Sequence, residues 1–85
     1  MEILYTAKFK KQYKKLPQPI KKTAKKQLGL LLSNPDHPSL KIKKMQDPRE
    51  IWEGRISRFY RFTFQKTKDA YVLRAICTHD VLNNP

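Results

Sequence analysis

Apolar residues recur along this chain at two different spacings. In the segment AKFKKQYKKL, Phe9, Tyr13 and Leu16 fall four and three positions apart, which places them along one face of a helix. Beyond residue 50, apolar and polar residues alternate, which is typical of strands with one buried face. The early part of the chain is therefore predicted to be mainly helical and the late part to form a sheet.

Short local signals set the limits of the early elements. The segment MEILYT alternates and predicts a short first strand; Thr6 can cap the helix that follows, and Pro17 ends it. Pro19 suits the first turn of a second helix, which ends at SNPDHPS. The apolar face of this second helix consists of Ile20, Ala24, Leu28, Leu31 and Leu32. The segment LKIKKM is either an edge strand or an extended loop.

Three strands are predicted near 50–57, 60–66 and 70–77, and the short loops between them imply antiparallel neighbours. The predicted fold is therefore α+β with the element order β-α-α-β-β-β. In this fold a helical hairpin packs on one face of a mainly antiparallel four-stranded sheet, and the other face is open to solvent. A length of 85 residues corresponds to a single domain over 1–85.

The register of the first two late strands follows from apolarity. If Ile56 pairs with Tyr60, the aromatic residues of both strands face the core. The inward set is then Trp52, Ile56, Tyr60, Phe62 and Phe64, and the outward set is Glu53, Arg55, Arg61 and Thr63. Arg55 lies directly opposite Arg61, a repulsive pair that is suited to a bidentate grip on phosphate. A solvated ion network with Glu53 is the alternative interpretation.

Strict alternation in the last strand turns Leu73, Ala75 and Cys77 inward and Val72, Arg74 and Ile76 outward. Cys77, the only cysteine, is then a small buried apolar residue, and no intramolecular disulfide is possible. His79 follows the end of this strand. Its ordinary pKa lies near neutrality, which makes it the best candidate for proton transfer. His37, His79 and one cysteine form no metal-ligand cluster, so neither a metal nor a cofactor is expected.

The net charge of +12 is unevenly distributed. Residues 1–45 carry +10 and residues 46–85 carry +2, which points to a polyanion or to a strongly acidic partner. A lysine coat that only maintains solubility is the alternative. No apolar run reaches the ~18 residues of a membrane span and no signal peptide is visible, so a cytoplasmic location is expected.

Three segments, HPSLKIKKM, IWEGRISRFYRFTF and LRAICTHDVL, together resemble the RelE/ParE superfamily of type II toxin–antitoxin toxins. The resemblance runs through nearly the whole chain. Within the superfamily the chain is similar to the ribosome-dependent mRNA interferases, including the YoeB and YafQ branches. The resemblance implies a RelE-like, microbial ribonuclease-like fold. It also implies an endoribonuclease that cleaves mRNA in the ribosomal A site without a metal.

The resemblance also implies roles for single residues. Arg61 matches the arginine that grips the scissile phosphate, His79 matches a general acid or base, and Arg55 occupies a position that is arginine or histidine in some catalytic members. Glu53 is either the base or a residue that orients an arginine. The cations assigned to the RNA backbone are Lys41, Lys43, Lys44, Arg58, Lys22 and Lys26.

The chain departs from the family pattern at two places. Asp80 stands where some members have a catalytic tyrosine, and it either orients the His79 ring or is a surface acid. Trp52 and Gly54 replace a lysine pair of some RelE members. These departures keep two alternatives open: a ParE-like DNA gyrase inhibitor and a catalytically degenerate module that binds RNA or the ribosome. For the mRNA interferase, the expected partners are the ribosome, mRNA and an acidic cognate antitoxin, with which it forms a heterotetramer or a larger complex.

Overall fold

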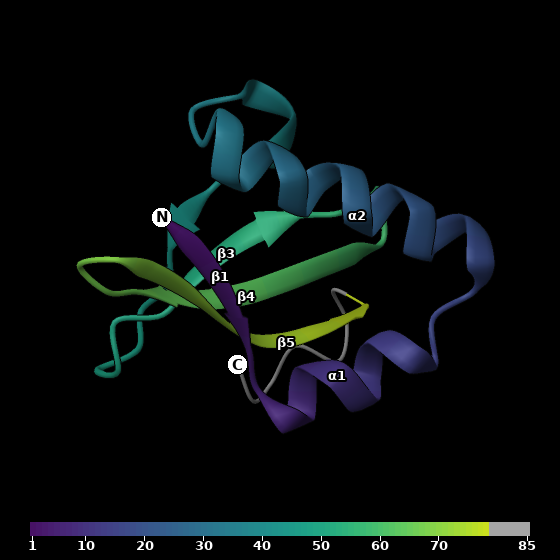
Figure 1. Cartoon of the computed structure of the whole chain (residues 1–85), viewed down its shortest axis with the longest axis horizontal. Coiled ribbons are helices and arrows are strands. Elements are labelled where there is room, and N and C mark those ends of the chain that lie inside the picture. Colours follow the sequence, from purple (N-terminus) through teal and green to yellow (C-terminus); the bar gives the residue numbers. More distant parts are fainter. Residues whose placement is uncertain (79–85) are drawn as a thin grey trace.

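The computed structural model of the chain describes residues 1–78; residues 79–85, which include His79 and Asp80, lie outside the described part. The elements, in chain order, are β1 (Glu2–Tyr5), α1 (Ala7–Lys14), α2 (Gln18–Ser33), the short 3-10 helix η1 (Pro38–Leu40), β2 (Lys43–Lys44), β3 (Trp52–Arg55), β4 (Tyr60–Lys66) and β5 (Ala70–Thr78). Their order confirms the predicted succession of a strand, two helices and a sheet (Figure 1).

The strands form a five-stranded sheet in the order β1-β5-β4-β3-β2. β1 pairs parallel to β5, whereas all other neighbours are antiparallel, so the mainly antiparallel sheet is confirmed. The fifth strand is β2, which lies within the LKIKKM segment and pairs with β3 at the edge of the sheet. The edge-strand reading of that segment is therefore the right one.

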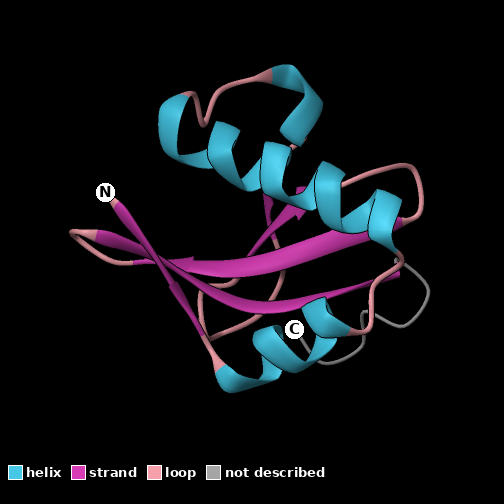
Figure 2. Ribbon diagram, turned by 45° about the vertical axis from the view of Figure 1, so that its right-hand side comes forward, coloured by secondary structure: helices cyan, strands magenta, loops and turns pink. Residues whose placement is uncertain are grey.

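Both helices contribute side chains to one hydrophobic core that they share with the sheet, and Figure 2 shows α2 and α1 beside the strands. α2 buries Ala24 and Leu31 completely, while α1 contributes Phe9, which is 2% exposed. From the sheet, the fully buried rings of Phe62 and Phe64 pack into the same core. This shared core confirms the predicted helical hairpin on one face of the sheet. The apolar stripes of both helices are removed from water by packing against the aromatic face of the strands.

α1 also closes the part of β5 that β1 does not reach. β1 pairs with β5 only as far as Leu73, so the backbone beyond that residue lacks a strand neighbour on this side. The Thr6 hydroxyl, which also caps α1, donates to the Leu73 carbonyl at 2.9 Å, and Gln12 Oε1 accepts from the Ile76 amide at 2.8 Å. Side chains of the first helix thereby satisfy backbone groups that would otherwise be unpaired.

The β3–β4 hairpin has the predicted register. Arg55 lies opposite Arg61, Gly54 lies opposite Phe62, and the Ile56 amide donates to the Tyr60 carbonyl at 3.0 Å. Gly54 is required here by close approach rather than by backbone conformation. A Cβ atom at this position would lie 2.3 Å from Cζ of the Phe62 ring, which occupies the space above the glycine.

The predicted facing of the last strand is wrong beyond Leu73. Thr63 pairs with Ala75 but Phe64 pairs with Leu73, so Arg74 is an extra residue of β5 and the strand carries a bulge. The bulge shifts the alternation by one position. Ile76 therefore lies opposite Phe62 in the core, whereas Ala75 and Cys77 lie on the other face with Thr63 and Arg61. Val72 and Arg74 keep their predicted outward direction, since Arg74 reaches Gln65 on that face.

Candidate functional site

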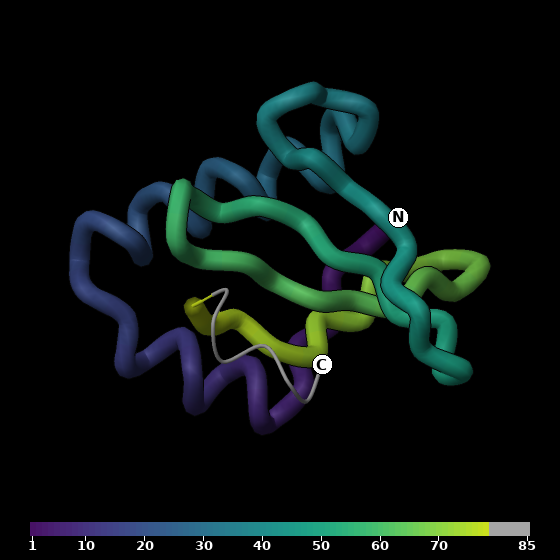
Figure 3. The backbone as a smooth tube through the Cα atoms, turned by 180° about the vertical axis from the view of Figure 1, so that it is seen from behind, coloured from purple at the N-terminus to yellow at the C-terminus, as the bar shows by residue number. Residues whose placement is uncertain are grey.

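The two opposed arginines lie on the face of the sheet that neither helix covers, as Figure 3 shows from behind. Arg55 ends β3 and Arg61 lies near the start of β4, and both are half-buried. Cys77 of β5 pairs with Arg61 from the other side, so three neighbouring strands meet at this point. The structure thus brings together the cationic pair that the register predicted.

Arg61 is held against the loop that joins β3 to β4. Its Nη1 donates to the carbonyl oxygens of Ser57 at 2.8 Å, Arg58 at 3.1 Å and Tyr60 at 3.1 Å. A guanidinium has five N–H donors, so one nitrogen braces the loop while other N–H groups remain for a ligand. The side chain that is assigned to the phosphate therefore also fixes the shape of the hairpin end.

Arg55 carries a buried donor without an acceptor. Within residues 1–78, Arg55 Nε and Thr63 Oγ1 are buried side-chain atoms that have no hydrogen-bond partner. Gln27 of α2 fixes the Arg55 backbone, since its Nε2 donates to the Arg55 carbonyl at 3.0 Å. A buried polar atom that stays unpaired costs about 1–3 kcal/mol, so this face of the sheet carries an uncompensated polar cost beside Arg61.

Glu53 lies next to these donors and is only 5% exposed. Its Oε2 is 3.3 Å from the Nζ of Lys43, which pairs with it across β2 and β3. Directly opposite residues share a face, so Lys43, one of the predicted RNA-binding lysines, lies on the arginine face. The Lys43 ammonium forms an ion pair with one oxygen of the Glu53 carboxylate. This contact is compatible with either predicted role of Glu53, as the general base or as the residue that orients an arginine.

The sequence analysis left Arg74 and Gln65 out of the site. Arg74 Nη1 donates to Gln65 Oε1 at 3.1 Å, and Gln65 Nε2 donates to the Arg49 carbonyl at 2.9 Å. These contacts add a third guanidinium to the same face, further along the strands from Arg61. The bulge at Arg74 has no clear signature in the sequence. The presence of one arginine on each of three adjoining strands could nevertheless have suggested that Arg74 belongs to the site.

The β2–β3 loop contributes a neutralised ion pair beside this cluster. Arg49 forms two hydrogen bonds to Asp47, from Nε at 3.0 Å and from Nη2 at 2.7 Å. These bonds lower the pKa of Asp47 from the ordinary 3.8 to about 2, with a smaller contribution from the charge of Arg74. The carboxylate therefore stays ionised at every pH above about 2, and Arg49 remains paired across the physiological range.

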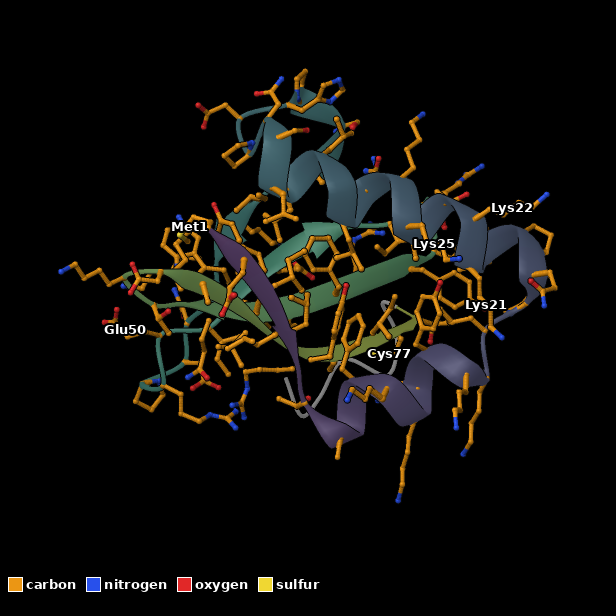
Figure 4. All side chains as sticks on the ribbon, viewed as in Figure 1. Met1, Lys21, Lys22, Lys25, Glu50 and Cys77 are labelled. Atoms are coloured by element: carbon orange, nitrogen blue, oxygen red, sulfur yellow. The ribbon has the colours of Figure 1, made fainter. Side chains whose placement is uncertain are left out.

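The other predicted RNA-binding lysines do not join the arginine face. Lys44 pairs with Trp52 in register, so it points to the opposite face, where its Nζ is 3.4 Å from Glu50. Lys41 has a left-handed backbone (φ 46°) and lines a separate pocket of about 490 Å³ with Trp52 and His37. Lys22 and Lys26 are exposed on α2, and Figure 4 shows Lys22 on that helix. Arg58 is exposed at the hairpin loop beside Arg61.

Cys77 is half-buried rather than part of the core, because the bulge turns it toward the arginine face. Burial raises the pKa of its thiol above the ordinary 9.0, and the charge of Lys8 offsets only part of this. The thiol is therefore protonated at neutral pH and is a poor nucleophile. His79, the predicted proton-transfer residue, lies outside the described residues.

An apolar groove of about 550 Å³ opens between the two helices and β1. Its floor is apolar, and three lysines line it. The lining includes Ile3, Tyr5, Phe9, Tyr13, Leu28 and Leu32, together with Lys10, Lys14 and Lys25. The Tyr13 hydroxyl donates to the Lys21 carbonyl at 3.3 Å and fixes the end where the helices meet. In Figure 4, Lys25 lies between the helices whereas Lys22 projects outward.

Two kinds of site are not found in the part of the chain that the structure describes. Residues 1–78 contain no group of three histidine, cysteine or acidic side chains that could hold a metal ion. None of the helices described is both long and apolar enough to cross a membrane.

No family model and no curated protein sequence matches this chain. Solved structures do match. YafQ from E. coli strain BL21(DE3) superimposes with a TM-score of 0.80 at 18% identity, over 96% of this chain and 97% of that one. The RelB–RelE antitoxin–toxin complex from Methanococcus jannaschii matches with a TM-score of 0.74 at 20% identity, over 91% of each chain. The YoeB dimer from Staphylococcus aureus gives 0.71 at 15%, over 93% and 95%. The likeness confirms the RelE/ParE-type toxin fold.

Proposed function

We propose that this chain, which has the toxin fold just described, is the toxin of a type II toxin–antitoxin system and an endoribonuclease that cleaves mRNA on the ribosome. The observation that carries the proposal is the opposed pair Arg55 and Arg61 on adjoining strands, beside Lys43. Donors of this kind fit the oxygens of a phosphodiester. Since ribosomes lie in the cytoplasm, the protein acts there.

The reaction uses the nucleophile that RNA carries, its 2′-hydroxyl. Attack on the adjacent phosphorus gives a pentavalent phosphorane with extra negative charge on its oxygens, and the bond to the 5′-oxygen then breaks. Arg61 and Arg55 stabilise this negative charge. Because both arginines lie on paired strands, they need no reorganisation during the reaction. One group must take the 2′-hydroxyl proton and another must protonate the leaving 5′-oxygen. In this scheme no metal ion takes part.

His79 is the proposed proton-transfer residue. Thr78 ends β5 and pairs with Tyr60, the neighbour of Arg61. His79 is the next residue after Thr78 in the sequence. Glu53 is the second candidate, either as the base or as the residue that positions Lys43 or an arginine.

Lysines on other surfaces serve binding rather than chemistry. Four exposed lysines lie away from the arginine face: Lys22 and Lys26 on α2, Lys41, and Lys44 at the sheet edge. They are proposed to bind ribosomal RNA, while Lys43 and Arg58 bind mRNA near the scissile phosphate. Contacts of this kind give a binding constant that falls steeply with salt.

The direct test is to map transcript ends after brief induction of the chain in cells. We expect new 5′ ends within coding regions of translated mRNAs, and none in an mRNA whose start codon is removed. Signalling of DNA damage with intact transcripts would instead support a gyrase inhibitor. Ribosome binding without new ends would support a noncatalytic module.

The partner that we propose is an acidic antitoxin whose amphipathic helix occupies the groove between α1 and α2. The groove has an apolar floor, and Lys10, Lys14 and Lys25 line it, so it fits a helix with one apolar face and acidic flanks. Leu32 and Tyr5 line the groove and are 43% and 45% exposed, which leaves apolar surface for a partner to cover. One helix per toxin allows a heterotetramer or a larger assembly.

Replacing Leu32 by glutamate is expected to weaken antitoxin binding at least about tenfold, because it places an acid against the partner's acidic flanks. Leu32 is partly exposed, so folding should be unaffected. The measurement is calorimetric titration with an amphipathic helical peptide that has one apolar face and acidic flanks. Phe59→Leu, which lies off the groove, is the matched control. Equal affinities for Leu32→Glu and the unchanged chain would place the partner elsewhere.

A further inference from the structure

The most exposed large apolar side chain described is Phe59, at 65% exposure. It lies in the loop between β3 and β4, at the end of the hairpin where Arg55 and Arg61 face each other. Single exposed apolar residues are common, so exposure alone carries no meaning. What distinguishes Phe59 is the way in which the surrounding loop is built.

The loop that carries Phe59 is held from within. Arg61 Nη1 bonds to the carbonyl oxygens of Ser57 and Arg58, on the N-terminal side of Phe59, and to that of Tyr60, on its C-terminal side. The Ser57 amide also donates to the Tyr60 carbonyl at 3.3 Å. The ring is therefore presented from a fixed turn, and the same arginine sets its position relative to the proposed phosphate site.

A cation already lies over the ring. The Arg58 guanidinium carbon is 5.4 Å from the Phe59 ring centroid. Because the residue is still 65% exposed, ring surface remains for a second planar group. An aromatic ring flanked by arginines is the arrangement on which single-stranded nucleic acids stack their bases.

We infer that Phe59 is a stacking platform for a nucleobase of the RNA whose phosphate Arg55 and Arg61 bind. The inference rests on the proposed function for its substrate class and adds the residue that holds the base next to the phosphate. RNA is the occupant favoured by charge, since Arg58 lies over the ring, Arg55 and Arg61 belong to the same hairpin, and the chain carries +12. Single-stranded RNA exposes its bases for such stacking, whereas duplex RNA does not.

The test compares the affinities of Phe59 variants for a single-stranded RNA oligonucleotide and for the same oligonucleotide with abasic nucleotides, by fluorescence anisotropy at fixed salt. Phe59→Leu keeps an apolar side chain but removes the π face. We expect it to lose about 5- to 100-fold in affinity for intact RNA and almost nothing for abasic RNA. Phe59→Trp should bind intact RNA at least as tightly as the unchanged chain. The slope of affinity against salt should not change, because no phosphate contact is lost.

Leu4→Ala, which shortens an exposed apolar side chain of β1 outside the groove and the hairpin, is the matched control and should bind both RNAs normally. Equal losses on intact and abasic RNA, or no loss on either, would overturn the inference. So would a Phe59→Leu variant that binds RNA normally and binds the acidic partner weakly. The assay needs no cleavage: a base-dependent loss in a chain that leaves mRNA whole supports the platform and refutes the nuclease. If the chain cleaves mRNA but Phe59→Leu shows no base-dependent loss, the nuclease is supported and the stacking platform is refuted.

Discussion

His79→Ala is expected to cut programmed mRNA on purified ribosomes about 10²–10⁴-fold more slowly than the unchanged chain. The reason is that the imidazole is the proposed group for proton transfer at the 2′-oxygen or the 5′-oxygen. The pH dependence of the cleavage rate is a second readout. If His79 titrates in the reaction, the inflection near its ordinary pKa of about 6.5 disappears in the variant.

Two further variants separate catalysis from folding. His37→Ala removes the other histidine of the chain, whose Nδ1 accepts from the Ser39 amide in η1, and it should cleave normally. Arg61→Lys keeps the charge but loses the planar fork, so it should lower the rate and also loosen the loop that Arg61 braces. Wild-type rates for His79→Ala and Arg61→Ala would together refute the assigned chemistry.

Gly54→Ala is expected to destabilise the fold by about 1–3 kcal/mol, since the added Cβ would lie 2.3 Å from the Phe62 ring, which is fully buried. The measurement is the free energy of unfolding in urea. Gly29→Ala is the matched control: nothing lies within 4 Å of its added Cβ, and alanine in a helix is better than glycine by about 0.5–1 kcal/mol. The same substitution should therefore have opposite signs at the two glycines.

A double variant tests the cause of the Gly54 effect. Phe62→Leu alone should destabilise the core, but in combination with Gly54→Ala the loss should be smaller than the sum, because the smaller side chain makes room for the Cβ atom. Strict additivity of the two changes would show that the ring does not limit position 54.

The hairpin of β3 and β4 could be predicted in detail, and the reason is physical. Its aromatic residues fall on every second position, so only one register buries them all and leaves Arg55 opposite Arg61. β5 could not be predicted in the same way. Its bulge at Arg74 moves Ile76 into the core and Cys77 out of it, and the alternation argument assumes that no such extra residue exists.

The candidate site divides in the same manner. Lys43 and Lys44 were predicted together as RNA-binding cations, but only Lys43 lies on the arginine face, because successive residues of a strand alternate. Phe59 received no role from the sequence because it fell in the short loop between two predicted strands, outside both the inward and the outward set. Its position between two arginines within a predicted turn was the available signal. His79 stays a prediction.

The sheet finishes at β2, a strand of two residues, both lysine. A longer, uncharged edge strand would pair with the edge strand of a second copy, and repetition of that pairing would build a fibre. Here a second copy would bring ammonium groups against ammonium groups and would find almost no backbone left to pair. The chain can therefore accumulate in its unbound state without polymerising from this side.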